Sequence, residues 1–82
     1  MKIFYKDEAV RKLKSLGPIE KKKAKRKIEN LLLNPLLGKQ LKGEFLGLRS
    51  LKAWPVRIIY TFDPKSETIT IITVDYRGSV YK

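Results

Sequence analysis

The side chains of this sequence that could do chemistry are cations and tyrosines, and two of each stand at its end. The ending VDYRGSVYK holds Tyr76, Arg77, Tyr81 and Lys82 directly after an apolar, strand-like run. Such an ending is either a frayed, solvated terminus, which is the common fate of terminal residues, or a functional segment held beside the core. The rest of the composition favours the functional segment, because it leaves few other reactive groups.

The sequence contains no histidine and no cysteine. This excludes the usual acid–base pair at neutral pH, disulfides and thiolate metal sites. The eight acidic residues have no paired spacing that would hold a metal ion, and no glycine-rich phosphate loop is present. We therefore expect no cofactor and no metal. Cleavage of RNA by its own 2′-hydroxyl is one reaction that fits, because clustered cations can neutralise the charge of a pentavalent phosphate.

Net charge narrows the class of partner. The chain has 19 lysines and arginines against 8 acids, a net charge of +11, whereas a small soluble domain typically carries a magnitude of about 2–8. Nucleic acid, an anionic membrane and an acidic protein all match this charge, and we favour nucleic acid or a machine that contains it. We find no apolar run of membrane-spanning length and no signal peptide. The sequence thus predicts one cytoplasmic domain over residues 1–82, with no membrane partner.

Local signals predict two helices in the first half. Residues 7–16 carry apolar side chains at helical spacing, and Asp7 is the expected N-cap. Gly17-Pro18 ends this helix and opens a second one, which Asn34-Pro35 ends in turn. The second helix carries six cations over residues 21–27, which either attract phosphate or form a solvated face.

Strand signals fill the second half. Residues 48–53, 56–62 and 68–74 are rich in β-branched and aromatic residues, and the run 2–5 also favours a strand. We predict an α+β fold, in which the two N-terminal helices pack on one face of a twisted, mainly antiparallel sheet of three to four strands. The other face of the sheet is expected to be open.

Single cations stand among apolar and aromatic residues in this half, which is the pattern of a site for phosphates and unpaired bases. Arg57 lies within an apolar strand, where an unpaired cation is costly to bury. It therefore either faces an open site, which we favour, or pairs with an acid such as Asp75. Strand alternation places Arg49 and Lys52 on opposite faces, so they are not expected to point into one site together. Trp54 is either an exposed anchor for a partner or a hydrophobic plug.

The segments LKGEFLGLRSLKAWPVRIIYTFD and YRGSVYK, in this order of elements, resemble the RelE/ParE superfamily of type II toxin–antitoxin toxins. The resemblance covers almost the whole chain, and its ending is similar to that of archaeal RelE-type toxins. It implies a RelE-like fold and an mRNA interferase that cuts codons in the ribosomal A site by 2′-hydroxyl attack, which inhibits translation. It also implies a cognate, acidic, RelB-like antitoxin in a hetero-oligomer.

The resemblance also assigns roles to residues. Arg57 matches the strand arginine that stabilises the transition-state phosphate, and Arg77 matches an arginine important for toxicity. Tyr81 matches a tyrosine that stacks on the base or activates the 2′-hydroxyl, and Lys52 stands where a strand cation is common. We add as RNA contacts Arg49, Lys42, Lys39 and Lys82.

The sequence departs from the best-known bacterial RelE at two strand lysines, which fall at Leu48 and Ser50 here. Two other functions therefore stay open. ParE members share the fold and poison DNA gyrase without cutting RNA, and a basic nucleic-acid-binding relative without strong catalysis has the same composition.

Overall fold

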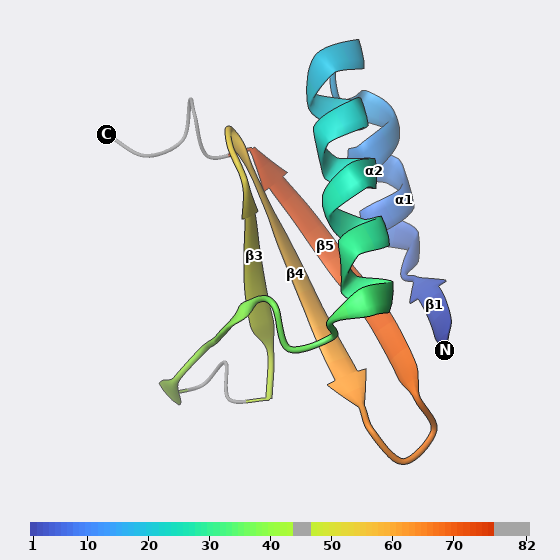
Figure 1. Cartoon of the computed structure of the whole chain (residues 1–82). Coiled ribbons are helices and arrows are strands. Elements are labelled where there is room, and N and C mark those ends of the chain that lie inside the picture. Colours follow the sequence, from blue (N-terminus) through green and yellow to red (C-terminus); the bar gives the residue numbers. More distant parts are fainter. Residues whose placement is uncertain (44–46, 77–82) are drawn as a thin grey trace.

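The structure, a computed structural model, describes residues 1–43 and 47–76. Two helices lie together on one face of a single twisted sheet (Figure 1). Along the chain the elements are β1 (Lys2–Tyr5), α1 (Asp7–Ser15), α2 (Pro18–Leu33), β2 (Lys39–Gln40), β3 (Arg49–Ala53), β4 (Val56–Asp63) and β5 (Thr68–Tyr76). The predicted α+β class and the placement of the helices are confirmed.

Both helices begin and end close to the predicted residues. Pro18 is the first residue of α2, and α2 ends at Leu33, directly before Asn34-Pro35. The prediction of Asp7 as N-cap is wrong by one residue: Lys6 has the extended N-cap conformation, and no side chain caps the helix. Asp7 instead lies in the first turn, where its negative charge stabilises the helix through the helix dipole.

The sheet has five strands in the order β1-β5-β4-β3-β2, rather than the three or four expected. β1 pairs with β5 in parallel, and the remaining pairs are antiparallel. The extra strands are short segments at the two edges. Residues 2–5 were predicted to be extended, but their pairing depends on a partner far along the chain, which local patterns do not reveal.

The core lies between the helices and one face of the sheet, as strand alternation requires. β4 contributes Val56, Ile58 and Tyr60 to it, while β5 contributes a second row. The row from β5 is Ile69, Ile71 and Val74, and the buried residues from the other elements are Ala9, Ala24, Ile28, Leu31, Leu51 and Ala53. The opposite face of the sheet has no helix over it in the described part of the chain (Figure 1). Neither α1 nor α2 has the length and apolar composition to cross a membrane.

Candidate functional site

Lys52 and Arg57 lie directly opposite each other on β3 and β4. Residues paired in this way project from the same face of a sheet, with their side chains adjacent. The register also pairs Lys39 with Ser50, two residues before Lys52, so Lys39 belongs to the same face. Three of the cations predicted from the sequence are therefore brought to the open face of the sheet.

These cations border a groove of about 660 Å³. Lys42, another predicted RNA contact, lines it as well, and Lys27 reaches it from α2. The remaining lining residues are Leu37, Gln40, Leu41, Ser50 and Leu51. No carboxylate lines the groove among the described residues, so it attracts anions.

Arg57 is the half-buried member of this group, and its Nε is buried without a hydrogen-bond partner in the described part of the chain. Asp75, opposite Arg57 on β5, is bound elsewhere: Lys12 Nζ of α1 donates to Asp75 Oδ1 at 2.9 Å. The hydrogen bond to Asp75 raises the pKa of the Lys12 ammonium group. The alternative pairing of Arg57 with Asp75 is therefore not observed among the described residues.

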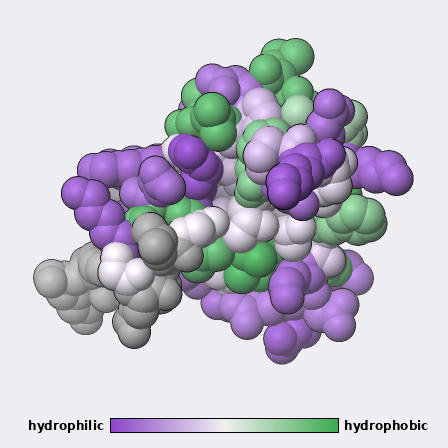
Figure 2. Space-filling model, turned by 90° about the horizontal axis from the view of Figure 1, so that it is seen from below, coloured by the Kyte–Doolittle hydropathy of each residue, from purple (hydrophilic) through white to green (hydrophobic). Residues whose placement is uncertain are grey.

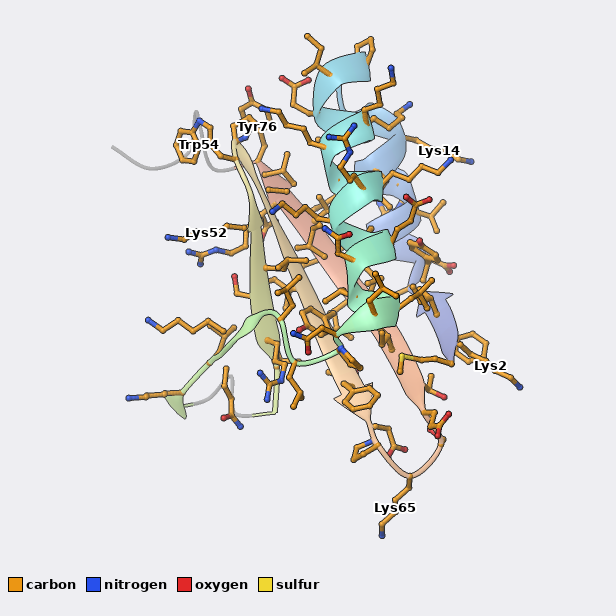
Figure 3. All side chains as sticks on the ribbon, in the orientation of Figure 1. Lys2, Lys14, Lys52, Trp54, Lys65 and Tyr76 are labelled. Carbon is orange, nitrogen blue, oxygen red and sulfur yellow. The ribbon has the colours of Figure 1, made fainter. Side chains whose placement is uncertain are left out.

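An arginine held in this way is suited to a phosphate ligand. A buried N–H without a partner costs about 1–3 kcal/mol, so the guanidinium is held in this position at a cost to stability. Guanidinium groups bind phosphate through two parallel hydrogen bonds, which adds geometric specificity to the attraction of opposite charges. Lys52, exposed beside it, projects away from the helices (Figure 3) and adds a second positive charge.

Arg49 does not join this group. Its partners across the sheet are Gln40 and Tyr60, on the face that packs against the helices. Its Nη1 donates to the carbonyl oxygen of Gly38 at 2.8 Å and to that of Leu36 at 3.5 Å. The structure thus places Arg49 beneath the loop between α2 and β2, with its guanidinium bound to that loop.

Sequence reasoning missed the role of Tyr60 in the same loop. The fully buried Tyr60 hydroxyl donates to the Pro35 carbonyl and accepts from the Gly38 amide, each at 2.8 Å. Burial raises the pKa of Tyr60, so the hydroxyl keeps its proton at neutral pH. The signal was present in the sequence, since a tyrosine within an apolar strand needs a partner for its hydroxyl. This bond fixes the loop that leads into Lys39 and the groove.

Three predicted site residues, Arg77, Tyr81 and Lys82, lie outside the described residues.

Apolar surface adjoins the groove at the end of α2. Leu33 is 88% exposed, and Leu32, Leu36 and Leu37 are also exposed. Leu37 lines the groove as well, so the apolar and cationic surfaces are continuous. Seen from below, the molecule shows hydrophobic patches bordered by hydrophilic side chains (Figure 2). This combination suits a partner that presents both apolar and acidic side chains.

Comparison with known proteins identifies the family of the chain. The family model described as the ParE toxin of type II toxin–antitoxin systems matches residues 3–81. The chain belongs to this toxin family. No curated protein sequence matches it.

Solved structures of toxins share the fold. The RelBE2 toxin–antitoxin complex of Mycobacterium tuberculosis contains a chain 28% identical to this toxin, with a TM-score of 0.85, and the match covers 93% of the toxin and 96% of that chain. The archaeal RelE–RelB complex of Pyrococcus horikoshii OT3 matches at 20% identity and a TM-score of 0.77, over 96% and 97% of the two chains. The YoeB/ParE toxin of Agrobacterium tumefaciens matches at 18% identity and a TM-score of 0.81, over 93% and 98%. Membership of the RelE/ParE superfamily, predicted from the sequence, is confirmed.

The contact between Tyr60 and Gly38 leads to a prediction about stability. A Cβ added at Gly38 would lie 2.6 Å from Tyr60 Cε1 and 3.1 Å from the Ser50 carbonyl oxygen, and neither neighbour can move freely. We expect Gly38→Ala to lower the free energy of unfolding by about 1–3 kcal/mol, measured by urea denaturation. Tyr60→Phe, which leaves the Gly38 amide and the Pro35 carbonyl without their partner, should cost a similar amount. A Gly38→Ala protein as stable as the wild type would contradict the close packing of this loop.

The unpartnered Nε of Arg57 leads to a prediction of opposite sign. Arg57→Met removes a buried donor and a cation directly opposite Lys52, while the apolar stem of the side chain is kept. We expect the free energy of unfolding to rise by about 1 kcal/mol, with a smaller gain in high salt because repulsion from Lys52 is then screened. Lys65→Met, at the turn between β4 and β5, is the matched control and should change stability little. A destabilised Arg57→Met protein would mean that the guanidinium is satisfied within the fold.

Proposed function

We propose that this toxin is a metal-independent endoribonuclease that cleaves translated mRNA on the ribosome, in the cytoplasm. The observation that carries the proposal is the pairing of Lys52 and Arg57 on the open face of the sheet, where both side chains line one groove. Lys39 and Lys42 line the groove beside them and would contact the neighbouring phosphates of the RNA strand.

The reaction is a transesterification within the substrate, in which one proton passes from the 2′-hydroxyl to solvent water and another passes from solvent water to the 5′-oxygen. The 2′-oxygen of the substrate attacks the adjacent phosphorus as its proton is removed, the bond from phosphorus to the 5′-oxygen breaks, and that oxygen takes up a proton. The products are a 2′,3′-cyclic phosphate and a 5′-hydroxyl. Arg57 and Lys52 stabilise the negative charge that develops on the phosphate. By resemblance to the family, Arg77 adds to this charge stabilisation, and Tyr81 stacks on the base or assists the 2′-hydroxyl.

A cognate antitoxin is the second partner that we propose. The matched complexes pair RelE-type toxins with RelB-type antitoxins. The exposed leucines at the end of α2 support a partner of this kind, because they adjoin the cationic groove. An acidic, amphipathic antitoxin would cover both surfaces, and the resting form would be the toxin–antitoxin hetero-oligomer.

Inhibition of DNA gyrase by binding is the alternative function. It is favoured by one observation, the match of residues 3–81 to the ParE family model. Under this alternative the groove has no catalytic role.

Induced expression without the antitoxin tests the proposal. We expect growth arrest together with new mRNA 5′ ends at fixed positions within codons. Arg57→Ala should lower the cleavage rate by about 10²–10³-fold, the cost of removing one donor that stabilises a developing oxyanion. Lys65→Ala removes a lysine from the far end of the sheet (Figure 3) and should leave cleavage unchanged.

Two results would overturn the assignment. Growth arrest without codon-positioned cuts, accompanied by loss of gyrase activity, would support the binding function. Full cleavage by Arg57→Ala would mean that the groove is not the site of the reaction.

A further inference from the structure

Trp54 is the only tryptophan of the chain, and it is 69% exposed at the turn between β3 and β4. A tryptophan buries more apolar area than almost any other side chain, and it is usually found largely buried or in an interface. Core packing therefore does not explain this residue. It stands at the end of the sheet where β5 finishes, as the labelled Trp54 and Tyr76 show in Figure 3.

The surroundings of Trp54 are cationic. A hollow of about 160 Å³ is lined by Trp54, Val56, Lys52 and Arg57. Lys52 and Arg57 also line the groove described above, so the hollow and the groove meet at these two side chains. Lys23 of α2 donates to the carbonyl oxygen of Trp54 at 3.4 Å, which holds the turn against the helix and adds a third positive charge nearby.

We infer that Trp54 is a stacking platform for an unpaired nucleobase whose phosphate is bound by Lys52 and Arg57. This inference rests on the proposed function and assigns a base subsite to the same groove. A nucleotide is both an anion and a flat aromatic group, so it needs cations and an exposed aromatic face within one nucleotide's reach. The hollow provides both. Stacking on an aromatic side chain is tolerant of sequence, because every base has a π-face.

A second aromatic side chain lies at the same end of the sheet. Tyr76 is opposite Val56 in the register of β4 and β5, and it is 41% exposed. Val56 follows Trp54 by two residues in the sequence and pairs with Tyr76 across the sheet. It also lines the hollow. Because paired residues share a face, Tyr76 projects from the helix-covered face together with Val56, and the proposed base subsite rests on Trp54 alone.

The fluorescence of Trp54 offers a direct test, because no other tryptophan contributes to the signal. The full chain is made by chemical synthesis, and a short 2′-O-methyl oligoribonucleotide, which cannot be cleaved, is titrated into it. We expect quenching of the emission on binding. An oligonucleotide of equal length and charge with abasic sites should bind more weakly and leave the emission almost unchanged, because it offers phosphates without bases.

Variants separate stacking from charge. Trp54→Ala should weaken binding of a labelled oligonucleotide, measured by anisotropy, by about 5- to 100-fold, and Trp54→Phe should keep part of the affinity. Trp54→Ala should leave the salt dependence of binding unchanged, whereas Lys52→Ala should reduce its slope by about 1. Phe4→Ala is the matched control, since Phe4 is an exposed aromatic on β1 at the opposite edge of the sheet.

The outcomes distinguish this inference from the proposed function. Equal binding and quenching by base-bearing and abasic strands would overturn the stacking role, as would an unchanged affinity of Trp54→Ala. If Lys52→Ala still weakens binding in that case, the RNA groove stands without a base subsite at Trp54. If Trp54→Ala lost affinity for an acidic partner protein but kept its affinity for the oligonucleotide, Trp54 would be an anchor for a protein and not for a base. A wild-type chain that binds no oligonucleotide would overturn the inference, whereas the proposed cleavage on the ribosome is decided separately by the 5′ ends of cellular mRNA.

Discussion

The alternation of side chains along β4 is the constraint on which the site depends. β4 is paired on both sides, with β3 and with β5, and Val56, Ile58 and Tyr60 point from it into the core. Because the period of a strand is two residues, burial of Ile58 obliges Arg57 to project from the opposite face. A slip of one residue in the register would exchange these two faces and place a cation in the core. The free energy that holds the core therefore also fixes the position of Arg57.

Hydrogen bonds from the core residue Tyr60 also position one wall of the groove. Tyr60 is a core residue, yet its hydroxyl binds both Pro35 and Gly38 at 2.8 Å. Arg49 secures the same loop from β3 through the carbonyl oxygen of Gly38. These bonds hold the segment that precedes Lys39, so one wall of the groove is fixed by hydrogen bonds from the core face of the sheet. Such a wall can hold a cation in place before a phosphate arrives, which reduces the entropy lost on binding.

Local chemistry made much of this structure predictable. Gly17-Pro18 marks the start of α2 and Asn34-Pro35 marks its end. These limits were predictable because proline restricts the backbone dihedral angles of itself and its immediate neighbour. Strand period alone separated Lys52 from Arg49. Contacts between distant segments were not predictable in this way: β1 joins β5 across most of the chain, and the Tyr60 hydroxyl finds partners that no pattern within β4 reveals. The N-cap of α1 was predicted one residue too late, at Asp7, because aspartate favours both the N-cap and the first helical turn.

The charge of the groove connects stability with binding. Lys52 and Arg57 lie opposite each other with the same sign, an arrangement that destabilises a sheet, in a chain of net charge +11. An anion between them turns this repulsion into two attractions, and any ligand that binds only the folded chain stabilises it by mass action. RNA phosphates and the carboxylates of an acidic protein satisfy the same two cations. Under the proposed function these two partners would compete for the groove, so an acidic partner seated there would block RNA without any change in the shape of the toxin.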